Sequence, residues 1–163
     1  MNKAEVPARP GPDGGPGLVT MRMIRLFVAL RRGGILAQRR RFGLSETEWR
    51  IMAQLGETAP LSLNGLGEAM LQDRGQLSRA VKAMVERGLL TRERKPGGPE
   101  IEIGLSDEGR ALHARMFDWV IERDRLLTAG FAEADTAVLW RLLDAMLGRA
   151  QAMMEEEQRL GEG

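Results

Sequence analysis

The chain has 163 residues, of which 43% are apolar and 29% are charged, a composition typical of a soluble globular domain. It contains no cysteine and one histidine, which excludes disulfides, thiolate metal sites and catalytic sets built on several histidines. Aromatic residues make up only 4%, with no tyrosine, which argues against aromatic stacking platforms for single-stranded nucleic acid. The net charge is +1, so the distribution of charge is more informative than its total.

Basic residues are concentrated in two parts of the chain. Residues 1–44 carry nine basic and two acidic residues, and residues 74–95 carry seven and two. No apolar run approaches the roughly 18 residues of a membrane span, and the first residues lack the apolar segment of a secretory signal. We therefore expect a cytoplasmic protein that does not enter a membrane and whose basic surface lies in these two segments.

Residues 1–17 contain four prolines and four glycines and are predicted to form a flexible tail without a core. From residue 18 to residue 43 the spacing of apolar residues predicts a helix. Within it, Gly33 and Gly34 predict a kink, a close approach of another helix, or a break. Gly43 suits the position that directly follows a helix.

Two short helices are predicted next. Ser45-Glu46-Thr47-Glu48 is a capping box and opens a helix with Trp49, Met52 and Leu55 spaced for burial, which ends near Gly56. Pro60 and Ser62 are predicted to start the second helix. Its buried side is predicted to carry Leu63, Leu66, Met70 and Leu71.

A third helix is predicted over residues 73–87, with a capping box from Asp73 to Gln76 and a glycine end at Gly88. Helix, turn and helix, preceded by one further helix, form the helix-turn-helix arrangement. The third helix has an apolar face, which consists of Leu77, Ala80, Val81, Met84 and Val85.

The opposite face of that helix carries cations and hydrogen-bond donors. Gln76 and Arg79 lie near its start and are predicted to contact bases in a major groove, because glutamine pairs with adenine and arginine with guanine. Arg74, Ser78 and Lys82 are predicted to contact phosphates, which position the protein without reading sequence. The alternative for all five is an ordinary solvated helix face.

Residues 89–105 predict a β-hairpin, because a basic strand and an alternating strand flank the turn Lys95-Pro96-Gly97-Gly98-Pro99. Directly after a helix-turn-helix, such a hairpin is a wing. Arg92, Arg94 and Lys95 are predicted to contact phosphates or a groove, and the alternative is that they are strand-edge charges.

Two long helices are predicted to follow. Ser106-Asp107-Glu108 caps the first, which ends near Ala129, and Gly130 precedes the second, which begins near Glu133. The apolar stripe of the second helix reaches Met154 and is longer than one small module requires. We therefore expect a second copy of the chain to cover it.

These segments together resemble the MarR family of winged-helix transcription factors. The resemblance covers residues 18–158, and the matching segments are GLSETEWRIMAQLGE, LGEAMLQDRGQLSRAVKAMVERGLLTRER and LSDEGRAL, followed by two long helices. It implies a mainly α fold with a small β-hairpin wing, in which the helices in 18–43 and 106–158 dimerise beside a winged helix-turn-helix over 45–105. It also implies a homodimer on pseudo-palindromic double-stranded DNA, with half-sites ~10 bp apart.

The wing tip departs from the family pattern. Family wings commonly carry an arginine there that enters the minor groove, whereas this chain has Pro96-Gly97-Gly98-Pro99-Glu100. The wing is therefore expected to contact phosphates only, or to rely on Lys95.

Small aromatic or amphipathic effectors bind relatives between the DNA-binding and dimerisation parts, and the resemblance makes Trp49, Met52 and His113 candidate effector contacts. The alternatives are plain core for the first two and an exposed or core residue for His113. The sequence has no phosphate-binding glycine loop or hydrolytic set, so we expect no enzyme, cofactor or metal. We expect a repressor. The alternatives are a helical protein-interaction module with a degenerate DNA face and a DNA-binding regulator that needs no effector.

Overall fold

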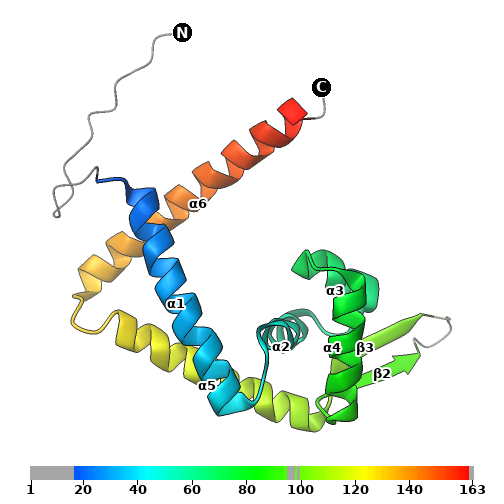
Figure 1. Ribbon diagram of the computed structural model, residues 1–163. Helices are drawn as coiled ribbons and strands as arrows, with labels where there is room; N and C mark the ends of the chain where they lie inside the picture. Colours follow the sequence, from blue (N-terminus) through cyan, green and yellow to red (C-terminus); the bar gives the residue numbers. More distant parts are fainter. Residues whose placement is uncertain (1–16, 95–97, 99, 162–163) are drawn as a thin grey trace. The chain divides into compact units, whose positions relative to one another are not determined.

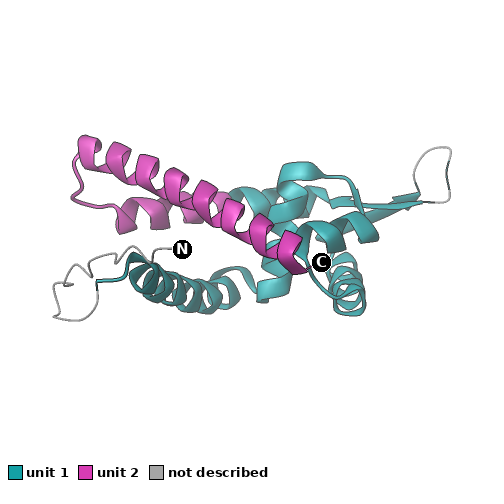
Figure 2. Ribbon diagram, turned by 90° about the horizontal axis from the view of Figure 1, so that it is seen from above, with its two compact units in different colours: residues 1–116 teal, residues 117–163 magenta. Residues whose placement is uncertain are grey.

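The computed structural model describes residues 17–94, 98 and 100–161. The chain divides into two compact units between residues 116 and 117 (Figure 2). Lys95 and all of the predicted tail except Gly17 lie outside the described residues.

The fold is mainly helical with a small antiparallel sheet, as predicted (Figure 1). In chain order the elements are α1 (Val19–Phe42), α2 (Glu46–Thr58), β1 (Leu61–Ser62), α3 (Leu63–Met70), α4 (Arg74–Glu86), β2 (Leu90–Arg94), β3 (Ile101–Leu105), α5 (Asp107–Leu127) and α6 (Glu133–Gly161).

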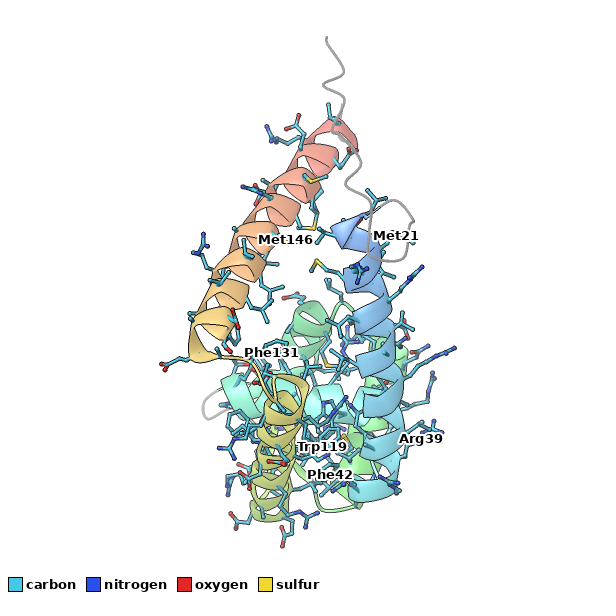
Figure 3. The ribbon with its side chains drawn as sticks, turned by 90° about the vertical axis from the view of Figure 1, so that its left-hand side faces the viewer. Met21, Arg39, Phe42, Trp119, Phe131 and Met146 are labelled. Carbon is cyan, nitrogen blue, oxygen red and sulfur yellow. The ribbon has the colours of Figure 1, made fainter. Side chains whose placement is uncertain are left out.

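Helix α1 runs without interruption through the glycine pair, so the predicted alternative of a break is wrong. Gly34 is the buried residue of this helix. The helix ends as predicted at Gly43, whose φ of 63° is favourable for glycine and whose N–H donates to the carbonyl of Arg39 at 3.1 Å. Phe42, at the opposite end of α1 from Met21 (Figure 3), is half-buried against the core.

The first unit has one hydrophobic core, to which α2, α3, α4, the sheet and the start of α5 all contribute. Its buried side chains are Leu44, Ile51, Met52, Leu55, Leu66, Met70, Leu77, Val81, Met84, Leu90, Ile103, Leu105, Leu112 and Met116. The burial of residues 77, 81 and 84 confirms the predicted apolar face of the third short helix.

The predicted hairpin is present, and a third short strand joins it. Strands β2 and β3 are antiparallel, with Leu90 opposite Leu105 and Arg94 opposite Ile101. Strand β1 pairs with the other edge of β3, where Leu61 lies opposite Ile103. The sequence did not predict β1, because a two-residue strand has no period of its own and depends on a partner far along the chain.

The prediction that Leu71 lies on the buried side of α3 is wrong. Its side chain is 94% exposed, and its backbone is left-handed, with φ 48° and ψ 48°. The N–H of Leu71 donates to the carbonyl of Glu68 at 3.3 Å and closes the end of α3. This left-handed cap turns the side chain away from the core side on which Leu66 and Met70 are buried.

Replacing Leu71 by glycine is expected to raise the free energy of unfolding by about 0.5–1 kcal/mol. The left-handed conformation costs an L-residue about 1–2 kcal/mol, and glycine's larger entropy when unfolded offsets part of the gain. Urea unfolding followed by circular dichroism measures the difference. Leu71→Ala keeps the Cβ and serves as the control without the gain. A Leu71→Gly protein less stable than the wild type would contradict the assignment of strain.

Helix α5 begins against the end of α4. The hydroxyl of Ser106 donates to the carbonyl of Gly88 at 2.6 Å and accepts from the N–H of Gly109 at 2.9 Å. The N–H of Ser106 donates to the carbonyl of Leu89 at 3.2 Å. The Leu-Ser-x-x-Gly segment therefore joins the start of α5 to the connection between α4 and β2.

The second unit contains the end of α5 and the whole of α6. Gly130, with φ 85°, separates the two helices, as predicted. Helix α6 has no buried residue along its 29 residues, although it carries many large apolar side chains. Of the helices in the described residues, none has the length and apolar character that a membrane span requires.

Candidate nucleic-acid interface

Helix α4 has one buried and one exposed face. Leu77, Val81 and Met84 are buried in the core. The five predicted DNA contacts of this helix are all exposed on its outer side: Arg74, Gln76, Ser78, Arg79 and Lys82. Hydrogen-bond donors and positive charge therefore project together from a helix whose other face is fixed by packing.

Asp73 caps the first turn of α4, which is one half of the predicted capping box. The carboxylate of Asp73 accepts a hydrogen bond from the N–H of Gln76 at 2.9 Å. Asp73 is thereby engaged with the helix itself, as expected of a cap residue. The side chains of Gln76 and Arg79 stay exposed beyond this cap.

Gly88 ends α4 as predicted, with a φ of 72°. Its N–H donates to the carbonyl of Val85 at 2.9 Å. The N–H of Leu89 donates to the carbonyl of Met84 at 2.9 Å, which completes a Schellman motif. The chain leaves α4 in a defined direction and enters β2.

The turn between α3 and α4 is held by side chains of α2. Nη2 of Arg50 donates to the carbonyl of Met70 at 2.6 Å, at the end of α3. Nε2 of Gln72 donates to the hydroxyl of Thr47 at 3.1 Å. Two side-chain hydrogen bonds therefore attach this turn to α2.

The wing has a basic side and an acidic side. Side chains alternate along a strand, so Arg92 and Arg94 lie on the same face of the sheet as the buried Leu90. On the other face, Glu93 lies opposite Glu102. The wing arginines thus extend from the face of the sheet that covers the core, and both are exposed.

The predicted wing contact by Lys95 lies at the tip of the hairpin. Lys95, Pro96, Gly97 and Pro99 lie outside the described residues. The predicted contact by Lys95 therefore stays a prediction from the sequence alone.

The three predicted effector contacts have different surroundings. Trp49 is half-buried, with its ring 5.6 Å from that of Phe42, and it lines a surface hollow of about 230 Å³ between α2 and α3. Met52 is fully buried in the core. His113 is half-buried with its ring against Gly56, so close that a Cβ there would lie 2.0 Å from Nε2. Neither Met52 nor His113 lines the hollow beside Trp49.

Sequence reasoning missed the residues that hold α4 in place. Glu48 was predicted as half of a capping box, and this is confirmed, because its carboxylate accepts from the N–H of Ser45 at 2.7 Å. The other oxygen of Glu48 accepts from Nη1 of Arg87 at 2.7 Å. Arg87 also donates through Nη2 to the carbonyl of Gly43 at 3.1 Å. These residues are 39 and 44 positions apart, so no local pattern indicates the contacts.

Comparisons with known proteins agree with this architecture. A MarR family model matches residues 42–98. A MarR/EmrR family transcriptional regulator from Acinetobacter is 26% identical, with 81% of this chain and 94% of that chain covered and a TM-score of 0.64. A probable transcriptional regulator from Pseudomonas aeruginosa is also 26% identical, with 78% and 97% covered and a TM-score of 0.59. A MarR family protein from Bacillus stearothermophilus shares the fold at 15% identity, with 81% and 93% covered and a TM-score of 0.72. No curated protein sequence matches the chain.

The matched segment contains the complete helix-turn-helix and strand β2. The similarity in fold extends over 81% of the chain, well beyond the matched segment. Residues 42–98 therefore match the MarR family model, and the fold of the chain is similar to that of MarR family transcriptional regulators.

Proposed function

We propose that the protein is a cytoplasmic, homodimeric repressor that binds a pseudo-palindromic operator through α4 and is released by a small molecule. The observation that carries the proposal is that α4 has one buried apolar face and one exposed polar face. Its apolar face is buried while Gln76, Arg79 and Lys82 are exposed on the other side. An α-helix presented in this way has the dimensions and the donors that a major groove accepts.

Contacts to DNA divide between bases and phosphates. Gln76 and Arg79 would read base edges, and Arg74, Ser78 and Lys82 would contact phosphates and set the register. Arg92 and Arg94 would add phosphate contacts from the wing, with Lys95 as a further contact beyond the described strand. The acidic side of the wing, with Glu93 and Glu102, would face away from the DNA, because like charges repel phosphates.

The uncovered apolar side chains of α6 support a homodimer. The large exposed ones are Val138, Leu139, Trp140, Leu142, Leu143, Leu147, Met153, Met154 and Leu160. Helix α1 also exposes large apolar residues, among them Ile24 at 54% and Phe27 at 63%. Many large apolar side chains exposed along one helix are characteristic of an interface, and permanent homodimer interfaces are the most apolar class. The helices in 18–43 and 106–158 would form this interface.

Release by an effector would follow if a ligand bound more tightly to a conformation that does not fit the operator. The hollow beside Trp49 supports a small aromatic ligand, because the indole ring and Arg50 border it together. Met52, which is fully buried, would contribute only as part of the core. His113, whose ring lies against Gly56, would contact an effector only at a place separate from this hollow.

The primary test measures binding of the purified protein to the DNA upstream of its own gene, with a shuffled duplex of the same length as control. Fluorescence anisotropy at several salt concentrations should give specific binding that weakens steeply with salt, because phosphate contacts release counterions. Sedimentation at micromolar concentration should give a dimer. Sedimentation as a monomer would contradict the two-helix docking on successive grooves.

Two alternatives predict different results. A protein-interaction module would dimerise but show no salt-dependent preference for the upstream DNA. A regulator without an effector would bind the operator, yet no small aromatic acid, with benzoate as the first probe, would shift its melting temperature or release the DNA.

A further inference from the structure

The first turn of α2 contacts both α1 and the helix-turn-helix. We call residues 46–50 the anchor segment, and each of them has a partner in another part of the first unit. The contacts are Glu46 with Arg31 at 2.8 Å, Thr47 with Gln72 at 3.1 Å, Glu48 with Arg87 at 2.7 Å, the Trp49 ring with that of Phe42 at 5.6 Å, and Arg50 with the carbonyl of Met70 at 2.6 Å.

On one side the anchor segment is joined to α1. Nε and Nη2 of Arg31 donate to the two carboxylate oxygens of Glu46 at 2.9 and 2.8 Å, which is the paired geometry that fixes a guanidinium most firmly. Trp49 packs on Phe42, in the last turn of α1. These contacts therefore couple the position of the anchor segment to that of α1.

On the other side it is joined to both ends of α4. Thr47 and Arg50 hold the turn before α4, and Glu48 holds Arg87 directly after it. Apolar packing by itself is non-directional and allows a helix to rotate or slide slightly. The hydrogen bonds of a guanidinium group are directional. Arg87 donates through Nη1 to the carboxylate of Glu48 and through Nη2 to the carbonyl of Gly43.

We infer that the anchor segment, chiefly through Glu48 and Arg87, fixes the orientation of α4 relative to α1 and thereby determines which spacing of half-sites the dimer accepts. The Glu48 side chain is only 14% exposed, so the ion pair is partly shielded from salt. The inference rests on the proposed function, because spacing has meaning only for a dimer that binds DNA. Arg87 is a positioning residue here and does not itself contact DNA.

The DNA test compares Arg87→Ala with the wild type on a duplex with one half-site and on the full operator. One half-site engages one recognition helix, so its affinity should stay within about twofold of the wild type. The full operator demands both helices at a fixed separation, and its affinity should fall roughly tenfold, or ~1.4 kcal/mol. Adding or removing one base pair at the centre of the operator should reduce the affinity of the variant less than it reduces the affinity of the wild type.

Glu48→Gln is the second variant, in case Arg87→Ala does not fold. Its amide oxygen can still accept from the N–H of Ser45, so the helix cap is kept while the charge of the pair is lost. The same pattern of half-site and full-site affinity is expected. Equal losses on both duplexes would mean that Arg87 contacts DNA and would overturn the inference, as would full-operator binding and spacing preference unchanged from the wild type.

A measurement without DNA separates this inference from the proposed function. The chain contains no cysteine, so Arg32→Cys in α1 and Ala83→Cys in α4, both exposed positions, accept spin labels without background. With labelled chain diluted in unlabelled chain, the distance distribution between the labels should broaden when Arg87→Ala is added. An equally narrow distribution would overturn the inference. A wild type that binds no DNA would instead contradict the proposed function.

Discussion

Gly109→Ala is expected to lower the free energy of unfolding by about 3 kcal/mol, at the upper end of the cost of overpacking. An added Cβ would lie 2.1 Å from the carbonyl oxygen of Leu89 and 3.1 Å from its carbonyl carbon. The obstacle is backbone, so no rotamer change relieves it. The start of α5 would have to move away from Leu89, whose carbonyl also accepts from the N–H of Ser106.

Thermal and urea unfolding of the purified variant measure this effect. Gly67→Ala is the matched control, because its Cβ would meet other atoms at an ordinary 3.8 Å. Gly67 is a helical glycine in the same unit, so its replacement by alanine is expected to raise the free energy of unfolding by up to about 1 kcal/mol. A Gly109→Ala protein as stable as the wild type would mean that α5 does not pack closely on Leu89.

Arg79→Ala is expected to weaken operator binding by about 1–3 kcal/mol, roughly 5- to 150-fold in Kd, and to relax specificity at one base position. Arg79 is exposed one turn beyond the capped start of α4, where a side chain reaches base edges most easily. Its removal leaves the buried face untouched, so stability should change little. Anisotropy titrations against a panel of single-base operator variants measure the specificity.

Lys82→Ala provides the comparison within the same helix. Nζ of Lys82 lies 3.9 Å from a carboxylate oxygen of Glu86, and both side chains are largely exposed, so the pair contributes little to stability. As a phosphate contact, Lys82 should weaken all operator variants equally and reduce the salt dependence by about one unit of slope. If Arg79→Ala behaves in the same uniform way, Arg79 contacts phosphate and the prediction of base reading is wrong.

Features with local causes were predictable from the sequence. The capping box at Ser45 and Glu48 and the glycine ends at Gly43 and Gly88 depend on residues within one turn of each other, and all three are as predicted. The exposed predicted contacts of α4 follow from the same kind of reasoning, because a helical period places them opposite the buried stripe. Their roles toward DNA stay predictions.

Other features depended on residues far apart in the chain. The spacing of apolar residues places Leu71 on the buried side only if α3 continues through that residue. The helix ends at Met70, and Leu71 forms its left-handed cap. Strand β1 exists through its pairing with Ile103 and Glu102. No property of Leu61 or Ser62 alone distinguishes that strand from a loop.

The sequence by itself determined the order of the elements, the two faces of α4 and the resemblance to the MarR family, because these depend on periodicity, caps and motifs within short segments. Only the tertiary structure decided how α4 is held. Arg87 finds Glu48 and Gly43, and Gly109 meets Leu89, only after the chain has folded. Such contacts depend on three-dimensional proximity, and neither charge nor spacing along the chain identifies which partner a long side chain reaches.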